Sequence, residues 1–319
     1  MKLIIQIPCL NEAQHLPEVL GDLPRTIAGV DKVEVLVIDD GSTDGTADVA
    51  RRHGADHVLR HAHNRGLAAA FAHGLEAALG LGADIIVNTD GDHQYSGGDI
   101  PRLVEPILKG EAEMVVGDRQ VSHLAHFSPM KKWLQKSGSL VVRWASRTSV
   151  PDATSGFRAL SREAALRLEV FSSYTYTLET LIQAGRKGMT VASVPVRANE
   201  VRRRSRLIGT MPNYVARSAV TILRVFLMYE ALRVFFILGS APFLAGLVLV
   251  ARFLYFYAIG DGSGHIQSLI VASILVVVGF LTFLLGLLGD LIAKNRHLSE
   301  ETNYRMKKAE LRRTSGHDR

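Results

Sequence analysis

Short apolar runs alternate with amphipathic and Ala-rich segments over the first third of the chain. The apolar runs predict five buried strands, at residues 2–7, 33–38, 57–59, 84–88 and 114–116. Helices are expected between them, including an Ala-rich helix over 66–81, another over 99–108, and a first helix capped by Asn11. Strands that alternate with helices indicate an α/β fold whose mainly parallel sheet is covered by helices on both faces.

The pattern changes in the last third, where two long stretches are apolar. Val234–Ala251 and Gln267–Gly289 contain no charged residue, and each with its flanks reaches the ~20 residues needed to cross a bilayer. Buried helices of a soluble domain usually have a polar face, which these stretches lack, so they predict two transmembrane helices. The preceding segment, Pro212–Tyr229, has apolar residues at helical spacing and predicts a helix lying in the membrane interface. Arg233 and Asp290 are expected at the same level of the hairpin, where they can pair.

Positive charge is distributed unevenly around the two predicted spans. The link at 260–266 has no Lys or Arg, whereas both flanking segments are rich in them, so both termini are expected in the cytoplasm. The N-terminal apolar run is too short for a signal peptide. We therefore expect a multi-pass protein of the inner (cytoplasmic) membrane. Its expected parts are a cytoplasmic α/β domain at 1–210, a juxtamembrane amphipathic helix at 211–231, a transmembrane hairpin at 232–292 and a basic cytoplasmic tail at 293–319.

Composition narrows the expected partners. The net charge of +6 over 319 residues is modest, and the basic excess lies beside the predicted spans. This distribution favours anionic membrane lipids as the partner of these charges and argues against nucleic acid. A single cysteine, Cys9, excludes an internal disulfide and fits a reducing compartment. Gly279, Gly286 and Gly289 on the second span allow a homo-oligomer packed through the transmembrane helices.

Candidate chemistry gathers where the predicted strands end. Asp90-Gly91-Asp92 directly follows the strand at 84–88, and two carboxylates at such an edge suit a hard divalent cation, Mg²⁺ or Mn²⁺. A plain Asp-Gly surface turn is the alternative. In parallel sheets the ligand site lies at the carboxyl ends of the strands. Other polar residues fall at the same edge: Asn11, Glu12, Asp39, Asp40, Asp118 and Arg119.

The loop after the first strand excludes two common nucleotide sites. It lacks the Gly-x-Gly-x-x-Gly pattern of dinucleotide-binding folds, and the chain has no Walker A sequence. A nucleotide would therefore have to be held by acidic residues at its base and sugar, with a metal on its phosphates.

Three separated motifs resemble one enzyme family. Ile7–Glu12, Val37–Thr46 and Asp90–Asp92 are similar to the family 2 glycosyltransferases of GT-A fold, and the resemblance covers roughly residues 1–200. Within that family, Asp152–Arg158 together with Gln94 resembles the polyprenyl-phosphate sugar synthases, which use dolichyl or undecaprenyl phosphate. The resemblance implies a Rossmann-like GT-A domain that binds a UDP- or GDP-sugar.

The same resemblance implies roles for individual residues. The nucleotide-sugar pocket would be formed by Pro8, Leu10, Asn11, Glu12, Asp39, Asp40, Arg65 and Asp90. The metal would be held by Asp90, Asp92 and Gln94, and the catalytic residues would be Asp92, Arg119 and Asp152. Two of these have simpler alternatives, because Arg65 can be a solvated loop arginine and Asp40 can cap the next helix.

The acceptor determines which further residues are needed. A hydroxyl acceptor requires a general base, whereas a lipid phosphate is already ionised and requires cations that relieve charge repulsion. The chain supplies such cations, and arginine suits phosphate well. The acceptor-phosphate residues are expected to be Arg119, Lys132, Lys136, Ser155, Arg158, Arg202 and Arg206. Arg202 and Arg206 also lie where they can contact anionic lipid.

These observations predict a metal-dependent, inverting glycosyltransferase. It would transfer a sugar from a GDP-mannose or UDP-glucose type donor to a polyprenyl phosphate, giving a lipid-monophosphate sugar donor for cell-envelope glycosylation. The alternative is a membrane-bound family 2 transferase acting on a hydroxyl of a glycolipid or polysaccharide, with Asp152 as base. A non-catalytic nucleotide-sugar sensor or scaffold is a third hypothesis, disfavoured by the presence of Asp92.

Overall fold

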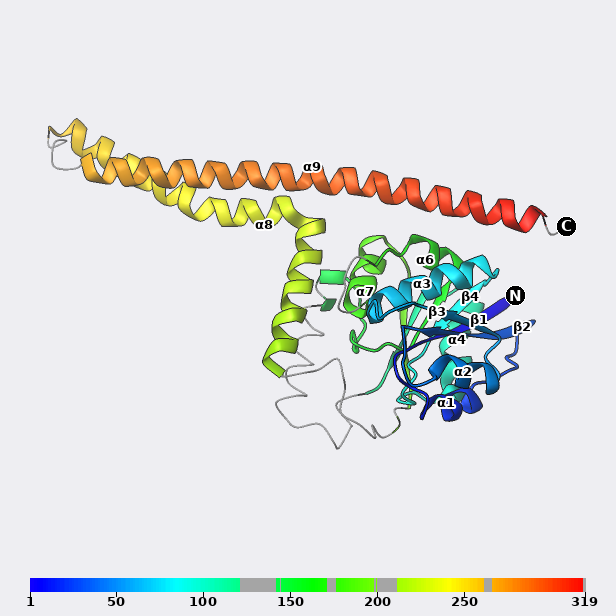
Figure 1. The fold of residues 1–319 in the computed structure, drawn as a ribbon. Coiled ribbons are helices and arrows are strands. Elements are labelled where there is room, and N and C mark those ends of the chain that lie inside the picture. Colours follow the sequence, from blue (N-terminus) through cyan, green and yellow to red (C-terminus); the bar gives the residue numbers. More distant parts are fainter. Residues whose placement is uncertain are drawn as a thin grey trace. The chain divides into compact units, whose positions relative to one another are not determined.

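The computed structural model describes residues 1–120, 142–143, 145–170, 176–197, 199, 211–260 and 266–317. The chain divides into two compact units. The first comprises Met1–Ile222 and Asn303–Arg319, and the second comprises Leu223–Thr302 (Figure 1). Lys132, Lys136, Arg202 and Arg206, four of the expected acceptor-phosphate residues, lie outside the described residues.

A mixed sheet forms the centre of the first unit. Its strands are β1 (Lys2–Cys9), β2 (Lys32–Asp39), β3 (His57–Arg60), β4 (Ile85–Asn88), β5 (Met114–Asp118), β6 (Arg158–Ser161) and β7 (Val191–Pro195). They are ordered β3-β2-β1-β4-β6-β5-β7, and β6 runs antiparallel to both of its neighbours. The other pairs are parallel, so the predicted mainly parallel α/β sheet is confirmed. The pattern of apolar runs had not indicated β6 or β7.

Helices cover both faces of this sheet (Figure 1). They are α1 (Leu16–Asp22), α2 (Thr46–Arg52), α3 (Leu67–Gly80), α4 (Ile100–Leu108), α6 (Arg162–Arg167) and α7 (Thr177–Arg186), with a 3-10 turn η1 at Gly97–Asp99. Alternate residues of β1 point to opposite faces. Leu3, Ile5 and Ile7 join the core formed with α1 and α4. The other face of β1 packs against α3, where a Cβ on Gly74 would lie 2.6 Å from Gln6 Oε1.

The direction of β6 brings two loops together at one edge of the sheet. β4 ends at Asn88 and leads into Asp90, whereas the antiparallel β6 begins at Arg158, which pairs with Asn88 in the register. The loop that precedes β6, residues 152–157, therefore lies at the same edge as the loop that follows β4. This edge is also where β1 and β2 end, at Cys9 and Asp39.

The C-terminal residues of α9 (Ile266–His317) belong to the first unit from Asn303 onward. They contact α6 and the turn after it: Lys308 Nζ lies 3.3 Å from Glu163 Oε2, and Asn303 Nδ2 lies 3.3 Å from Glu169 Oε1. The Tyr304 hydroxyl also donates to Glu163. Lys308 of the predicted basic tail is thus paired with a carboxylate of α6.

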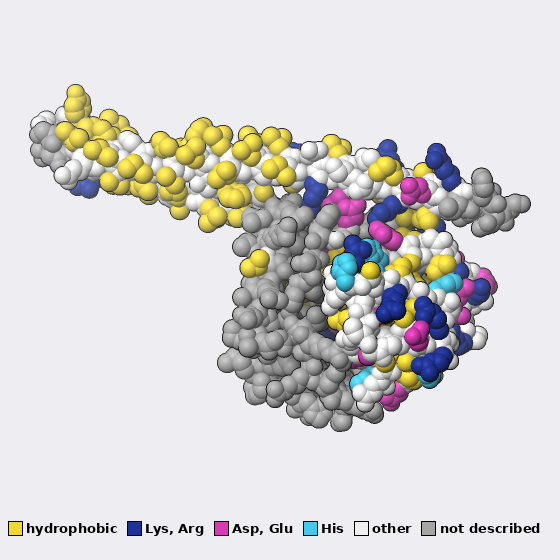
Figure 2. All heavy atoms as spheres, viewed as in Figure 1, with side chains coloured by type: hydrophobic (Ala, Val, Ile, Leu, Met, Phe, Trp, Pro, Cys, Tyr) yellow, Lys and Arg dark blue, Asp and Glu magenta, His cyan; other side chains and the backbone are white. Residues whose placement is uncertain are grey.

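The second unit contains most of α8 (Met211–Ala258) and α9. Within these helices, Glu230–Ala258 and Ile266–Leu311 are long and apolar enough to cross a membrane. Their most apolar stretches are only 11% and 17% buried, unlike the core helices of a soluble protein. Figure 2 shows hydrophobic side chains along the hairpin helices, and nearly all exposed large hydrophobic residues of the described chain lie there. That residues 211–229 lie in a membrane interface stays a prediction.

Glycines let the two long helices approach each other. A Cβ on Gly279 would lie 2.6 Å from Phe243 Cβ, one on Gly286 2.9 Å from Phe235 Cβ, and one on Gly289 2.8 Å from Ala231 Cβ. All three glycines therefore face α8 of the same chain. They serve the hairpin itself and do not by themselves support a homo-oligomer.

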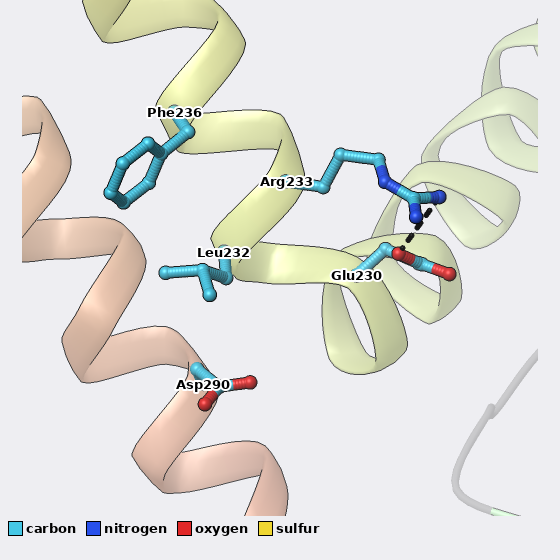
Figure 3. Close-up of a pocket in the computed structure, with 5 residues that line it drawn as sticks. All are labelled: Glu230, Leu232, Arg233, Phe236 and Asp290. Carbon is cyan, nitrogen blue, oxygen red and sulfur yellow. Dashed lines mark ion pairs between the residues drawn. The ribbon is translucent and has the colours of Figure 1, made fainter.

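A break in α8 shapes the polar end of the hairpin. Glu230 has non-helical backbone angles (φ −133°, ψ 29°), and its carboxylate lies 3.2 Å from Arg233 NH1 (Figure 3). Asp290 pairs instead with Lys294, at 2.9 Å. The expected pairing of Arg233 with Asp290 is thus wrong, because each residue has a nearer partner on its own helix. Glu230, Leu232, Arg233, Phe236 and Asp290 line a cavity of about 380 Å³.

Candidate active site

The loops after β1 and β2 are joined by hydrogen bonds. The backbone N–H of Asn11 donates to Ser42 Oγ at 2.8 Å, and its side-chain Oδ1 accepts from the Thr43 amide at 2.9 Å. Asn11 lies in the left-handed region (φ 53°), which asparagine tolerates better than most residues. The expectation that Asn11 caps the first helix is wrong, because α1 begins at Leu16 and Asn11 is committed to the neighbouring loop.

Two of the expected nucleotide-binding carboxyl groups are buried below these loops. Asp39 is 1% exposed; its Oδ1 accepts from the Ser42 amide at 2.9 Å, and its Oδ2 lies 3.3 Å from Arg60 Nε. Glu12 is 7% exposed, and its amide donates to Thr46 Oγ1 at 3.0 Å. The ends of β1 and β2 thus carry Pro8, Leu10, Glu12 and Asp39, as the sequence motifs predicted.

Asp40 organises the loop that carries Arg65. Its carboxylate accepts from the amides of Arg65 at 2.8 Å and Gly66 at 2.9 Å, and it lies 2.8 Å from His61 Nδ1. His61 Nε2 in turn lies 2.8 Å from Nδ1 of His73 on α3. Because a carboxylate accepts, His61 donates to Asp40 through Nδ1, and its Nε2 is left to bond with His73. Asp40 therefore reaches the start of α3 and does not cap α2, the helix that follows it in sequence.

No sequence motif predicted the hydrogen bonds that connect Asp40, His61 and His73. Burial, and then the Arg65 cation, lower the pKa of His73. The Arg65 side chain itself is exposed. Gly41 is required beneath the loop, because it has φ 76° and a Cβ there would lie 2.5 Å from the His63 carbonyl carbon. The backbone of residues 63–66 is therefore fixed, while the Arg65 guanidinium stays accessible.

The Asp90-Gly91-Asp92 motif rests on the first strand. A Cβ on Gly91 would lie 2.7 Å from Cys9 Sγ and 3.4 Å from Glu12 Cγ, so only glycine fits between them. Burial raises the pKa of Asp90 to about 7; the carboxylates of Asp92 and Glu12 add to this, while Arg119 acts against it. Burial is the main cause of this shift, and the neighbouring carboxylates of Asp92 and Glu12 make the site rich in negative charge.

This donor set fits a hard divalent cation. Asp90 and Asp92 offer carboxylate oxygens, and Asp92 Oδ1 also accepts from the Gln94 amide at 3.2 Å. Within the described residues, no group of three or more His, Cys, Asp or Glu side chains is arranged to hold a metal. Mg²⁺ and Mn²⁺ sites of phosphate-transfer enzymes commonly take one or two carboxylates and complete their shell with substrate phosphates and water. The two aspartates suit that kind of shared site.

Arg119 and Asp152 form a buried ion pair beside this motif. Arg119 Nε lies 2.7 Å and NH2 3.0 Å from the two carboxylate oxygens of Asp152, and NH2 also donates to Thr154 Oγ1 at 2.8 Å. Burial alone would raise the pKa of Asp152, but Arg119 and Thr154 hold it below its usual value. A carboxylate with a lowered pKa is a weak general base. Asp152 is thus built to hold Arg119.

The loop before β6 is placed directly against Asp90. A Cβ on Gly156 would lie 3.0 Å from Asp90 Oδ1 and 2.9 Å from the Tyr176 hydroxyl. The Gly156 amide donates to the Tyr95 hydroxyl at 3.1 Å, and the Asn88 side chain donates to the Gly156 carbonyl at 2.8 Å. Tyr95 and Tyr176 were not anticipated, because their roles depend on contacts with segments far away in sequence.

Arg158 holds this loop from inside the protein. It is 0% exposed and donates to the carbonyls of Ser155 and Ala153, both at 2.9 Å, and to Thr180 Oγ1 at 2.7 Å. Burial lowers its pKa to about 10. Ser155 is also fully buried, and its Oγ accepts from the Phe157 amide at 3.3 Å. Both residues, expected at the acceptor phosphate, have polar atoms directed to the loop itself, and Arg158 also bonds to Thr180 on α7.

Comparison with known proteins agrees with this geometry. The profile described as Glycosyl transferase family 2 matches residues 4–168. An uncharacterised glycosyltransferase of Mycobacterium tuberculosis is 36% identical over 197 residues, which is 60% of this chain and 83% of the relative. An undecaprenyl-phosphate mannosyltransferase of Micrococcus luteus is 31% identical over 206 residues, covering 61% and 83%.

A solved structure shares the fold of the first unit. Glucosyl-3-phosphoglycerate synthase from Mycobacterium tuberculosis, crystallised with Mn²⁺ and UDP-glucose, aligns with a TM-score of 0.54 and 25% identity over 69% of this chain and 78% of the other. The predicted GT-A fold and transferase activity are thereby confirmed, as is the resemblance to the polyprenyl-phosphate sugar synthases. The chain belongs to glycosyl transferase family 2.

Proposed function

We propose that this glycosyltransferase moves a sugar from a UDP- or GDP-sugar to a polyprenyl phosphate at the cytoplasmic surface of a membrane. The observation that carries this proposal is the position of Arg119. Its guanidinium is paired with Asp152 in the loop before β6, and it is close enough to Asp90 to oppose the rise in that carboxyl's pKa, so the metal motif and this loop share one cation. The names of the relatives give independent support.

The donor would be bound along the ends of β1, β2 and β4. Pro8, Leu10, Asn11, Glu12 and Asp39 line the nucleoside side, and the accessible Arg65 side chain is suited to the diphosphate. Asp90, Asp92 and Gln94 would hold Mg²⁺ or Mn²⁺. When bound, such an ion stabilises the negative charge that develops on the departing diphosphate.

The acceptor side is better suited to an anion than to a hydroxyl. One oxygen of the lipid phosphate attacks the anomeric carbon while the bond from that carbon to the diphosphate oxygen breaks, which inverts the configuration. No proton has to be removed, and the lowered pKa of Asp152 agrees with this. Arg119 supplies positive charge, and we expect Lys132, Lys136, Arg202 and Arg206 to add to it.

The long apolar helices would anchor the enzyme where its lipid acceptor resides. Both termini and the catalytic unit would be cytoplasmic, and basic residues beside the hairpin would contact anionic lipids. A homo-oligomer is not needed for the proposed reaction.

The test is a transfer assay with the purified full-length protein. The protein is incubated with Mn²⁺, undecaprenyl phosphate in detergent, and a panel of labelled UDP- and GDP-sugars. The expected product is a lipid-monophosphate sugar whose anomeric configuration, determined by NMR, is opposite to that of the donor. Transfer to free glycans or glycolipids from any donor, without a polyprenyl product, would overturn the proposal.

A further inference from the structure

The loop that carries Asp92 and Gln94 is held from several directions. On one side the His93 ring lies 3.6 Å from Glu18 and 3.7 Å from Asp22, both on α1. On another, Tyr95 is buried and its hydroxyl accepts from the loop before β6. His93 itself lies in the left-handed region (φ 58°), which is uncommon for a residue other than glycine and must be maintained by its surroundings.

Asn199 holds the same loop from the segment that follows β7. Its backbone N–H donates to the Gln94 carbonyl at 2.9 Å, and its side-chain Nδ2 donates to the His93 carbonyl at 3.0 Å. The segment is itself fixed two residues earlier, where the Arg197 amide donates to the buried Asp99 carboxylate at 2.7 Å. Asn199 therefore links an anchored strand end to two successive carbonyls of the proposed metal loop.

We infer that Asn199 is a positioning residue that fixes the metal-binding loop. This inference rests on the proposed metal site at Asp92 and not on the identity of the acceptor. Loss of the Asn199 side chain frees the His93 carbonyl and lets the strained turn relax, which moves Asp92 out of its place for the metal. The apparent affinity for the metal should then fall.

The experiment compares Asn199→Ala with the unaltered full-length protein. The Mn²⁺ concentration for half-maximal activity should rise about tenfold, as for other residues that orient metal ligands. At saturating Mn²⁺, kcat should be retained. A merely structural role would lower kcat or the metal-free melting temperature without this split.

A binding measurement without turnover separates this inference from the proposed function. The rise in melting temperature produced by Mn²⁺ and UDP, with no acceptor present, should be smaller in Asn199→Ala and in the similarly sized Asn199→Leu. Arg51→Ala on α2 is the control, because its side chain is 56% exposed and pairs with Asp48, which is itself 72% exposed. An Asn199→Ala protein with unaltered Mn²⁺ dependence in both assays overturns the inference, whatever acceptor the enzyme uses.

Discussion

The two halves of the sheet hold their functional side chains in different ways. In the parallel half, β3-β2-β1-β4, polar side chains bond to amides of the adjacent loop, as Asn11 does to Thr43 and Asp40 to Gly66. In the mixed half, β6-β5-β7, the loop before β6 is held by two arginines, the partly buried Arg119 and the fully buried Arg158. Removing one side chain should therefore mainly affect chemistry in the first half, and both chemistry and stability in the second.

The largest effect is expected at the metal motif. Asp92→Ala should lower kcat by about 1,000-fold or more, because stabilisation of the leaving group is lost, while the melting temperature without metal stays unchanged. Turnover is measured with saturating Mn²⁺ and donor. Asp48→Ala on α2 is the control, since that carboxylate is 72% exposed. Normal cellular function of the Asp92 variant would favour the non-catalytic sensor or scaffold.

Arg119→Ala, in the mixed half, should reduce both activity and stability, whereas Asp92→Ala should reduce activity alone. It leaves the 2%-exposed Asp152 carboxylate without its cation, and removal of one partner from a buried pair costs about 3–5 kcal/mol. Denaturant unfolding in detergent measures this loss. Asp152→Asn keeps a neutral partner for Arg119 and should cost less; abolished turnover with unchanged substrate binding in that variant would support the hydroxyl-acceptor alternative.

The Arg158→Met variant tests whether Arg158 stabilises the loop before β6 or binds the acceptor phosphate. Three hydrogen bonds from a charged donor are lost, so the free energy of unfolding should fall by about 2–3 kcal/mol. The KM for undecaprenyl phosphate should not change at a temperature where the variant is folded. If KM rises and stability is unchanged, Arg158 contacts the acceptor after all. Arg51→Met is the control, because this arginine is 56% exposed and pairs with Asp48, which is 72% exposed.

The smallest effect concerns the far end of the parallel half. Burial alone would raise the pKa of Glu34, but hydrogen bonds from Lys2, Lys32 and His57 lower it to about 2, from a usual 4.5. Its stabilising contribution is therefore complete above pH 4.5 and is lost as pH falls toward about 2. Acid unfolding of Glu34→Gln should lack this component. Identical pH profiles for both proteins would contradict the assignment.

The sequence was most informative for the parallel half. β1, β2 and β4 are largely apolar runs, which is how a strand buried on both faces appears in a sequence, and only β3 is short and partly buried. β6 is four residues long and begins with the buried Arg158, and β7 is only partly buried, so neither shows a clear hydrophobic period. Because β6 and β7 were not predicted, the sequence could not show that the antiparallel β6 brings the loop at 152–157 to the site.

The same division holds for the candidate site. Asp39, Asp90 and Asp92 follow strands directly, so motif and spacing were enough to place them at one edge. His61, Tyr95, Tyr176 and Asn199 act through partners 12 to 106 residues away. Arg158 illustrates the converse, because its charge suggested phosphate, whereas its burial assigns its donors to backbone carbonyls.

The contact between the end of α9 and α6 has a consequence for biosynthesis. Strands β1 to β7 are all translated before Leu223, so the sheet can form while the hairpin is still in the ribosome, since domains fold as units from the N-terminal side. Glu163 bonds to Tyr304 and Lys308, and these two residues emerge from the ribosome only after both hydrophobic segments. We therefore expect the segment from Asn303 onward to join the catalytic unit last, after the hairpin has been made. The final folding step of that unit would then depend on insertion of the hairpin into the membrane.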